Sequence, residues 1–183
     1  IVAILAAILF PVFAQAKQAA KKTACASNLR QIGLGLAMYT SDWDETVPET
    51  THTSGGEDGR SWVVALGPYL KSDDVRICPA DPNGPARKKA GGTSYILNEW
   101  IAVPGIDANF DLLPQPRVTD FPLPSQTIST FIVADPEPGQ NDFAETEDHT
   151  HSRNWFKKSD GKVFARITSD VSVDRFGGNP DHT

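Results

Sequence analysis

His149 and His151, preceded by Glu147 and Asp148, come closest to a catalytic or metal-binding pattern. On a strand, the His-X-His spacing would place both rings on one face, as zinc sites in some hydrolases require. No third ligand can be named, and no serine or cysteine nucleophile motif accompanies the pair. We therefore interpret it as part of a polar loop and expect the chain not to be an enzyme.

Two acidic clusters have the residue types that bind a hard cation. They are Asp42, Asp44 and Glu45 and, in a proline-rich stretch, Asp135, Glu137, Asp142, Glu145, Glu147 and Asp148. Calcium takes six to eight oxygen ligands, which flexible acidic loops can supply. Neither cluster has EF-hand spacing, and runs of charge are usually solvated. We expect no cofactor; the alternative is a calcium ion at Asp135, Asp142, Glu145 and Asp148.

Cys25 and Cys78 are the two cysteines of the chain. An oxidising exterior would favour a disulfide between them, which would fasten the segment around Cys25 to the rest of the protein. Two free buried thiols are the alternative. A metal site is not expected, because no histidine or third cysteine lies at ligand spacing from either residue.

A long helix is predicted over residues 1–40, and it carries Cys25. Residues 1–16 are uncharged and apolar apart from Pro11 and Gln15, a run too short by itself for a membrane span. Residues 17–40 form an amphipathic half, with an apolar stripe that continues just past it to Trp43. Its members recur at spacings of three and four residues: Cys25, Leu29, Ile32, Leu36, Tyr39 and Trp43. Gly33 and Gly35 fall off this stripe. Pro11 should kink the helix or locally melt it.

Residues 41–183 read as a loop-rich, β-rich head. All 23 acidic residues fall here, against 13 of the 17 basic ones, so a nucleic-acid partner is not expected. Ser61–Leu70 could be a short helix or strand, and Thr127–Ala134 is the clearest strand. Prolines exclude long regular elements through 104–126. Other short apolar runs are Thr93–Leu97, Trp100–Val103, Lys162–Thr168 and Val171–Val173.

Tryptophans and one Asp-Gly pair complete the head. We expect Trp43 and Trp62 in the core and leave Trp100 and Trp155 open between core and surface. Asp160-Gly161, between two segments that alternate apolar and polar residues, predicts a β-hairpin turn.

Three segments together resemble bacterial type IV pilin-like proteins. They are ILAAILFPVFAQAK, CASNLRQIGLGLAMYTSDWDETVP and YLKSDDVRICPADP. More narrowly, the chain resembles a prepilin-type group with a His-X9-Asp-Gly signature. It departs from that signature, because His151 and His149 precede Asp160 with eight and ten residues between them instead of nine. The resemblance implies a pilin start about ten residues upstream of Ile1, and a helix that stretches at Pro11 in assembled filaments.

The resemblance implies an α+β fold, with the long N-terminal helix packed on a small antiparallel sheet and proline-rich loops. Our first hypothesis is a structural subunit of an extracellular type IV pilus-like filament at the cell surface. Its partners would be copies of itself and, before assembly, the inner membrane. The alternatives are a minor pseudopilin of a secretion or DNA-uptake machine and a membrane-tethered calcium- or glycan-binding module. Assembly would depend on Ile4, Leu5, Ile8, Leu9, Phe10, Pro11 and Phe13.

Overall fold

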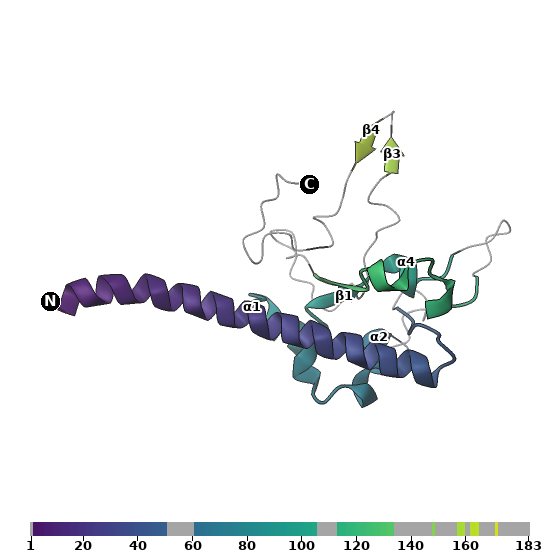
Figure 1. Cartoon of the computed structure of the whole chain (residues 1–183), viewed down its shortest axis with the longest axis horizontal. Helices are drawn as coiled ribbons and strands as arrows, with labels where there is room; N and C mark the ends of the chain where they lie inside the picture. Colours follow the sequence, from purple (N-terminus) through teal and green to yellow (C-terminus); the bar gives the residue numbers. More distant parts are fainter. Residues whose placement is uncertain are drawn as a thin grey trace.

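The computed structural model shows a rod-like helix with a small head on its second half (Figure 1). The structure describes residues 2–50, 61–105, 113–133, 148, 157–159, 162–164 and 171. Within them the architecture is α+β, as predicted: one long helix, several short helices and two small antiparallel sheets.

Helix α1 spans Val2–Asp42, close to the predicted 1–40. It continues through Pro11 without a break, so local melting at this proline is not seen in the isolated chain. A proline removes only one backbone donor from the ladder, and the hydrogen bonds of the neighbouring turns maintain the helix.

The head begins with short helical segments. Its elements in chain order are α2 (Trp62–Ala65), η1 (Gly67–Tyr69), η2 (Asp73–Arg76), α3 (Gly84–Lys89), β1 (Tyr95–Leu97), α4 (Glu99–Ala102), η3 (Val118–Asp120), η4 (Pro124–Gln126), β2 (Thr130–Ile132), β3 (Lys157–Ser159) and β4 (Lys162–Phe164). The described part of the head is therefore more helical than predicted. The run 100–103 lies mostly in α4 because the Asn98 side chain accepts a hydrogen bond from Trp100 N at 3.1 Å and caps that helix.

The central sheet pairs β1 with β2 antiparallel, with Ile96 opposite Phe131. The strand predicted over 127–134 thus forms over 130–132, and Val133 adds an isolated antiparallel bridge to Val171. Strands β3 and β4 also pair antiparallel, with Ser159 opposite Lys162, as the predicted hairpin requires; Asp160 and Gly161 themselves fall outside the described residues. The chain from 113 to 126 contains only 3-10 turns, as its prolines predicted.

The core lies between the second half of α1 and the head. Its largest fully buried side chains include Trp62, Tyr95, Ile32 and Leu66. The predicted helix stripe packs here through Cys25 and Ile32, with Leu29, Leu36 and Tyr39 partly buried against them. Burial of Trp62 confirms its predicted place.

One prediction about α1 is wrong: Trp43 is 58% exposed instead of buried, because α1 ends at Asp42 and the chain turns away. Gly35, although it falls off the stripe, is buried, and a Cβ there would lie 3.0 Å from Leu70 Cδ2. Its lack of a side chain lets η1 approach the helix closely.

Candidate assembly site

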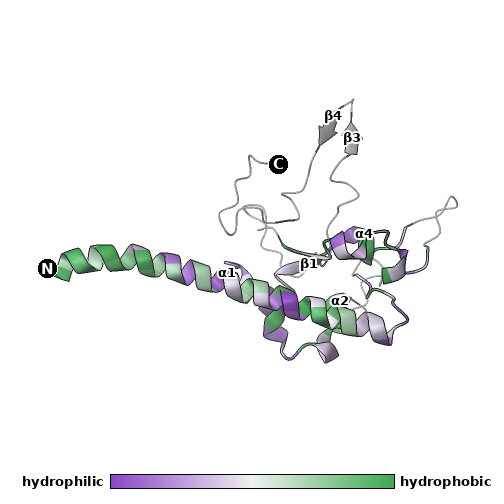
Figure 2. Ribbon diagram, in the orientation of Figure 1, coloured by the Kyte–Doolittle hydropathy of each residue, from purple (hydrophilic) through white to green (hydrophobic). Residues whose placement is uncertain are grey.

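The first half of α1 projects beyond the head, and most of it has the colour of hydrophobic residues (Figures 1 and 2). Phe10 is 73% exposed and Ile8 is 62% exposed. All seven predicted assembly residues are exposed: Ile4, Leu5, Ile8, Leu9, Phe10, Pro11 and Phe13. An apolar surface of this kind on a water-soluble monomer would be unfavourable, so it marks a site for lipid or protein.

Helix α1 is long and apolar enough to cross a membrane, and none of its most apolar 18-residue window is buried in the chain. At 1.5 Å per residue, its 41 residues extend about 60 Å, roughly twice the hydrocarbon core of a bilayer. Lys17, Lys21 and Lys22 follow the apolar half directly. The helix can therefore hold an apolar half in a membrane while its amphipathic half carries the head.

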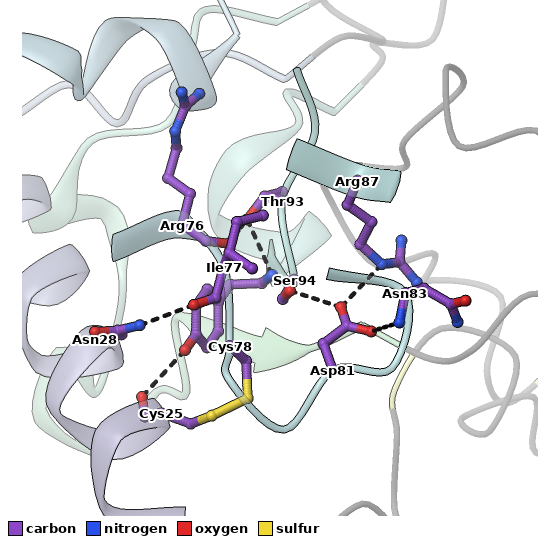
Figure 3. Close-up of a disulfide and its surroundings, with 11 residues drawn as sticks. Cys25, Asn28, Arg76, Ile77, Cys78, Asp81, Asn83, Arg87, Thr93 and Ser94 are labelled. Carbon is purple, nitrogen blue, oxygen red and sulfur yellow. Dashed lines mark hydrogen bonds and ion pairs between the residues drawn. A yellow bond between two sulfur atoms is a disulfide. The ribbon is translucent and has the colours of Figure 1, made fainter. Parts of the chain in front are cut away.

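A disulfide fastens the helix to the head. Cys25 of α1 is bonded to Cys78, with their Cα atoms 5.0 Å apart, and both residues are buried (Figure 3). Two hydrogen bonds flank it: Asn28 Nδ2 donates to Ile77 O at 3.0 Å, and Tyr95 Oη donates to Cys25 O at 3.3 Å. Position Asn28 could have been suspected from the sequence, since it lies three residues beyond Cys25 on the same helix face.

A buried ion pair supports the loop that carries Cys78. The Asp81 carboxylate lies 3.0 Å from Arg87 Nε and accepts hydrogen bonds from Ser94 Oγ at 2.6 Å and Asn83 N at 2.9 Å (Figure 3). Asp81 and Arg87 are both buried. These contacts hold the loop that follows Cys78 against Ser94, the residue before β1. They therefore stabilise the part of the head to which α1 is bonded.

An aromatic cluster lies at the head end of α1. Tyr39 and Trp43 stack with ring centroids 5.5 Å apart, and Tyr69 contacts Tyr39 edge-on at 5.9 Å. Tyr69 Oη donates to Asp42 Oδ2 at 3.0 Å. The cluster packs the C-terminal end of α1 against η1, and Trp43 remains exposed on its outer side.

Desolvation is the main cause that raises the pKa of Tyr39 and Tyr69 above 10; Glu49 adds to it at Tyr39, and the hydrogen bond to Asp42 adds to it at Tyr69. A tyrosine with a raised pKa binds its proton more tightly in the folded state than in the unfolded state. Its contribution to the free energy of unfolding is therefore fully present below pH 10 and is lost as the pH rises further. We expect the urea midpoint of the detergent-solubilised chain to stay constant up to about pH 10 and to fall above it. The fall should be smaller in Tyr69→Phe; an equal fall in both proteins would contradict this assignment.

The turn after α1 contains two non-glycine residues with positive φ, Asp44 (49°) and Glu45 (64°). Glu45 N donates to Thr40 O at 2.7 Å, and Glu45 O accepts from Val118 N at 2.8 Å. Glu45→Gly should therefore stabilise the head by about 1 kcal/mol, because glycine adopts this conformation without the Cβ clash. Urea unfolding measures the gain; Glu45→Ala, which keeps the Cβ, should show none.

Of the predicted calcium ligands, Asp148 alone lies among the described residues. It is buried, its Oδ2 accepts a hydrogen bond from Ser61 Oγ at 2.5 Å, and its backbone O accepts from Trp62 Nε1 at 2.6 Å. Asp148 thus holds α2 in place from the interior. Asp135, Asp142 and Glu145, like His149 and His151, fall outside the described residues. Within the described part, no three potential metal ligands gather.

The long helix with a small antiparallel sheet is a pilin-like α+β architecture. Residues 14–76 match the model of a family described as "Protein of unknown function (DUF1559)". The match runs from the end of the apolar half of α1 through η2, about a third of the chain. No curated protein and no solved structure matches the chain significantly.

Proposed function

We propose that this protein is a structural subunit of an extracellular type IV pilus-like filament, assembled through the apolar half of α1. The observation that carries the proposal is the exposure of Ile4, Ile8 and Phe10 on a helix that projects from the head. The family match over residues 14–76 is compatible with a pilin-like surface subunit.

The energetics favour burial of this helix against its copies. Burying about 1,000 Å² of apolar helix surface per subunit would contribute on the order of 25 kcal/mol before the cost of association is subtracted. The same half can remain in the inner membrane before assembly, because lipid also covers it. The disulfide and its flanking hydrogen bonds would then hold each head in a fixed position relative to its helix in the filament.

Electron microscopy of material sheared from producing cells, with mass spectrometry to identify this chain, tests the proposal. Thin uniform fibres composed mainly of this protein support a filament subunit. Recovery of the chain only as membrane-bound monomers would contradict it and would favour a membrane-tethered binding module. Trace amounts of the chain in fibres built from another subunit would favour a minor pseudopilin.

A further inference from the structure

The second half of α1 borders an apolar pocket of about 220 Å³. Gly33, Leu36 and Ala37 of the helix form one wall, and Val118, Phe121 and Pro124 form the other. An apolar cavity of about 150 Å³ can hold benzene, so this volume suits one aromatic side chain. The pocket is open to the surface, and Leu34 and Met38, on the adjacent face of α1, are 60% and 55% exposed.

An acidic surface follows the pocket along the chain. Asp42, Asp44 and Glu45 are all exposed, and the Trp43 ring between them is 58% exposed. Carboxylates beside an exposed indole ring attract a lysine ammonium through charge and through the cation–π interaction. An occupant that fits both features has an aromatic side chain, followed along its length by positive charges.

The apolar half of α1 has this order of side chains itself. Phe10, Phe13, Lys17 and Lys21 follow one another at spacings of three, four and four residues, which places them on one helix face. Phe13 is 66% exposed, Lys17 is exposed and Lys21 is partly exposed.

We propose that a second copy of this chain places Phe13 in the pocket, with the two α1 helices parallel and displaced by about 24 residues. This displacement aligns Phe13 with Ala37 and Lys17 with Ser41, next to Asp42. It places Lys21 just beyond the end of α1, where the turn contains Asp44 and Glu45. At 1.5 Å per residue it corresponds to about 36 Å along the helix.

The charges select the parallel orientation. In an antiparallel pair with Phe13 in the same pocket, Lys17 would lie beside Gly33 and Lys21 near Leu29 and Arg30, where α1 has no acid. The parallel contact joins two different surfaces of the same chain, so each copy still has one of each surface free. Such a contact does not close on itself and continues as a fibre. The inference rests on the proposed filament function and specifies its subunit register.

Cross-linking in fibres on producing cells tests the register. A Phe13→Cys/Ala37→Cys variant is treated with a short bis-maleimide, which spares the disulfide-bonded Cys25 and Cys78. The inference predicts a ladder of dimers, trimers and longer oligomers on a denaturing gel. The matched control, Phe13→Cys/Ser27→Cys, has its second thiol at another exposed position of α1 and should give no ladder. Fibres with no ladder from the first variant, or equal ladders from both, would overturn the register and leave the filament function standing.

Charge reversal tests the same contact with Phe13 kept, in case the cysteine variant does not assemble. Lys17→Glu with Lys21→Glu should lower fibre yield about tenfold, and adding Asp42→Lys with Glu45→Lys should restore it. Lys71→Glu with Lys89→Glu, an equal charge change on the exposed head, should leave yield unchanged. Failure of the second pair to restore yield would overturn the inference. Absence of fibres from the unmodified chain would contradict the proposed function itself.

Discussion

Replacing Cys25 and Cys78 together by alanine should lower the free energy of unfolding of the head by about 4 kcal/mol. The disulfide joins residues 53 positions apart, so its loss returns the entropy of a long loop to the unfolded chain. The remaining contacts between α1 and this loop, such as the Asn28–Ile77 hydrogen bond, are each worth about 1 kcal/mol and would not replace it.

Urea unfolding of the detergent-solubilised chain, followed by tryptophan fluorescence, measures this loss, because Trp62 is fully buried. Reduction of the unmodified protein should shift the midpoint as far as the double substitution does. A shift of less than about 1 kcal/mol would mean that packing, not the covalent bond, holds the helix to the head.

The second large effect is expected from Ile8→Asp. A carboxylate at the centre of an apolar helix costs about 3 kcal/mol in a membrane, which corresponds to roughly a hundredfold loss at equilibrium. A close-packed helix bundle would penalise the same charge, so we expect fibres to disappear from sheared material while the head remains folded.

The matched control is Ser27→Asp, which adds the same charge to an exposed position of the amphipathic half of α1. It should leave fibre yield unchanged. Ile8→Leu, which keeps the apolar character, should also assemble. Normal fibres from Ile8→Asp would show that residues 2–16 are not buried in the assembly.

The helix and its division into two halves followed from the sequence because periodicity and charge act locally. The residues of the apolar stripe from Cys25 to Tyr39 pack against the head as predicted, but Trp43, the last of the stripe, does not. There the backbone turns through positive φ at Asp44 and Glu45; aspartate tolerates this conformation, but the periodicity of the stripe does not show where the helix ends. The α4 helix was predictable in principle, since Asn98 is a strong N-cap residue.

The attachment site depended on contacts that no local pattern shows. No sequence pattern links Asp81 to Arg87, yet they form a buried pair because the turn after Cys78 brings them together. Gly35 lies against Leu70, a contact between residues 35 positions apart. The pocket beside Ala37 depends likewise on where residues 118–129 lie against the helix. Contacts between residues far apart in the sequence determine this packing, and they leave no periodic pattern in the sequence.

An electron cryo-microscopy reconstruction of the sheared fibres would show directly which part of each chain lies at the fibre axis. We expect a core of parallel α1 helices in which residues 2–16 of every chain are buried, with the disulfide-linked heads on the outside and neighbouring chains displaced by about 36 Å along the helix. Fibres whose axis is built from heads, with the apolar half of α1 exposed or absent from the contacts, would contradict this expectation.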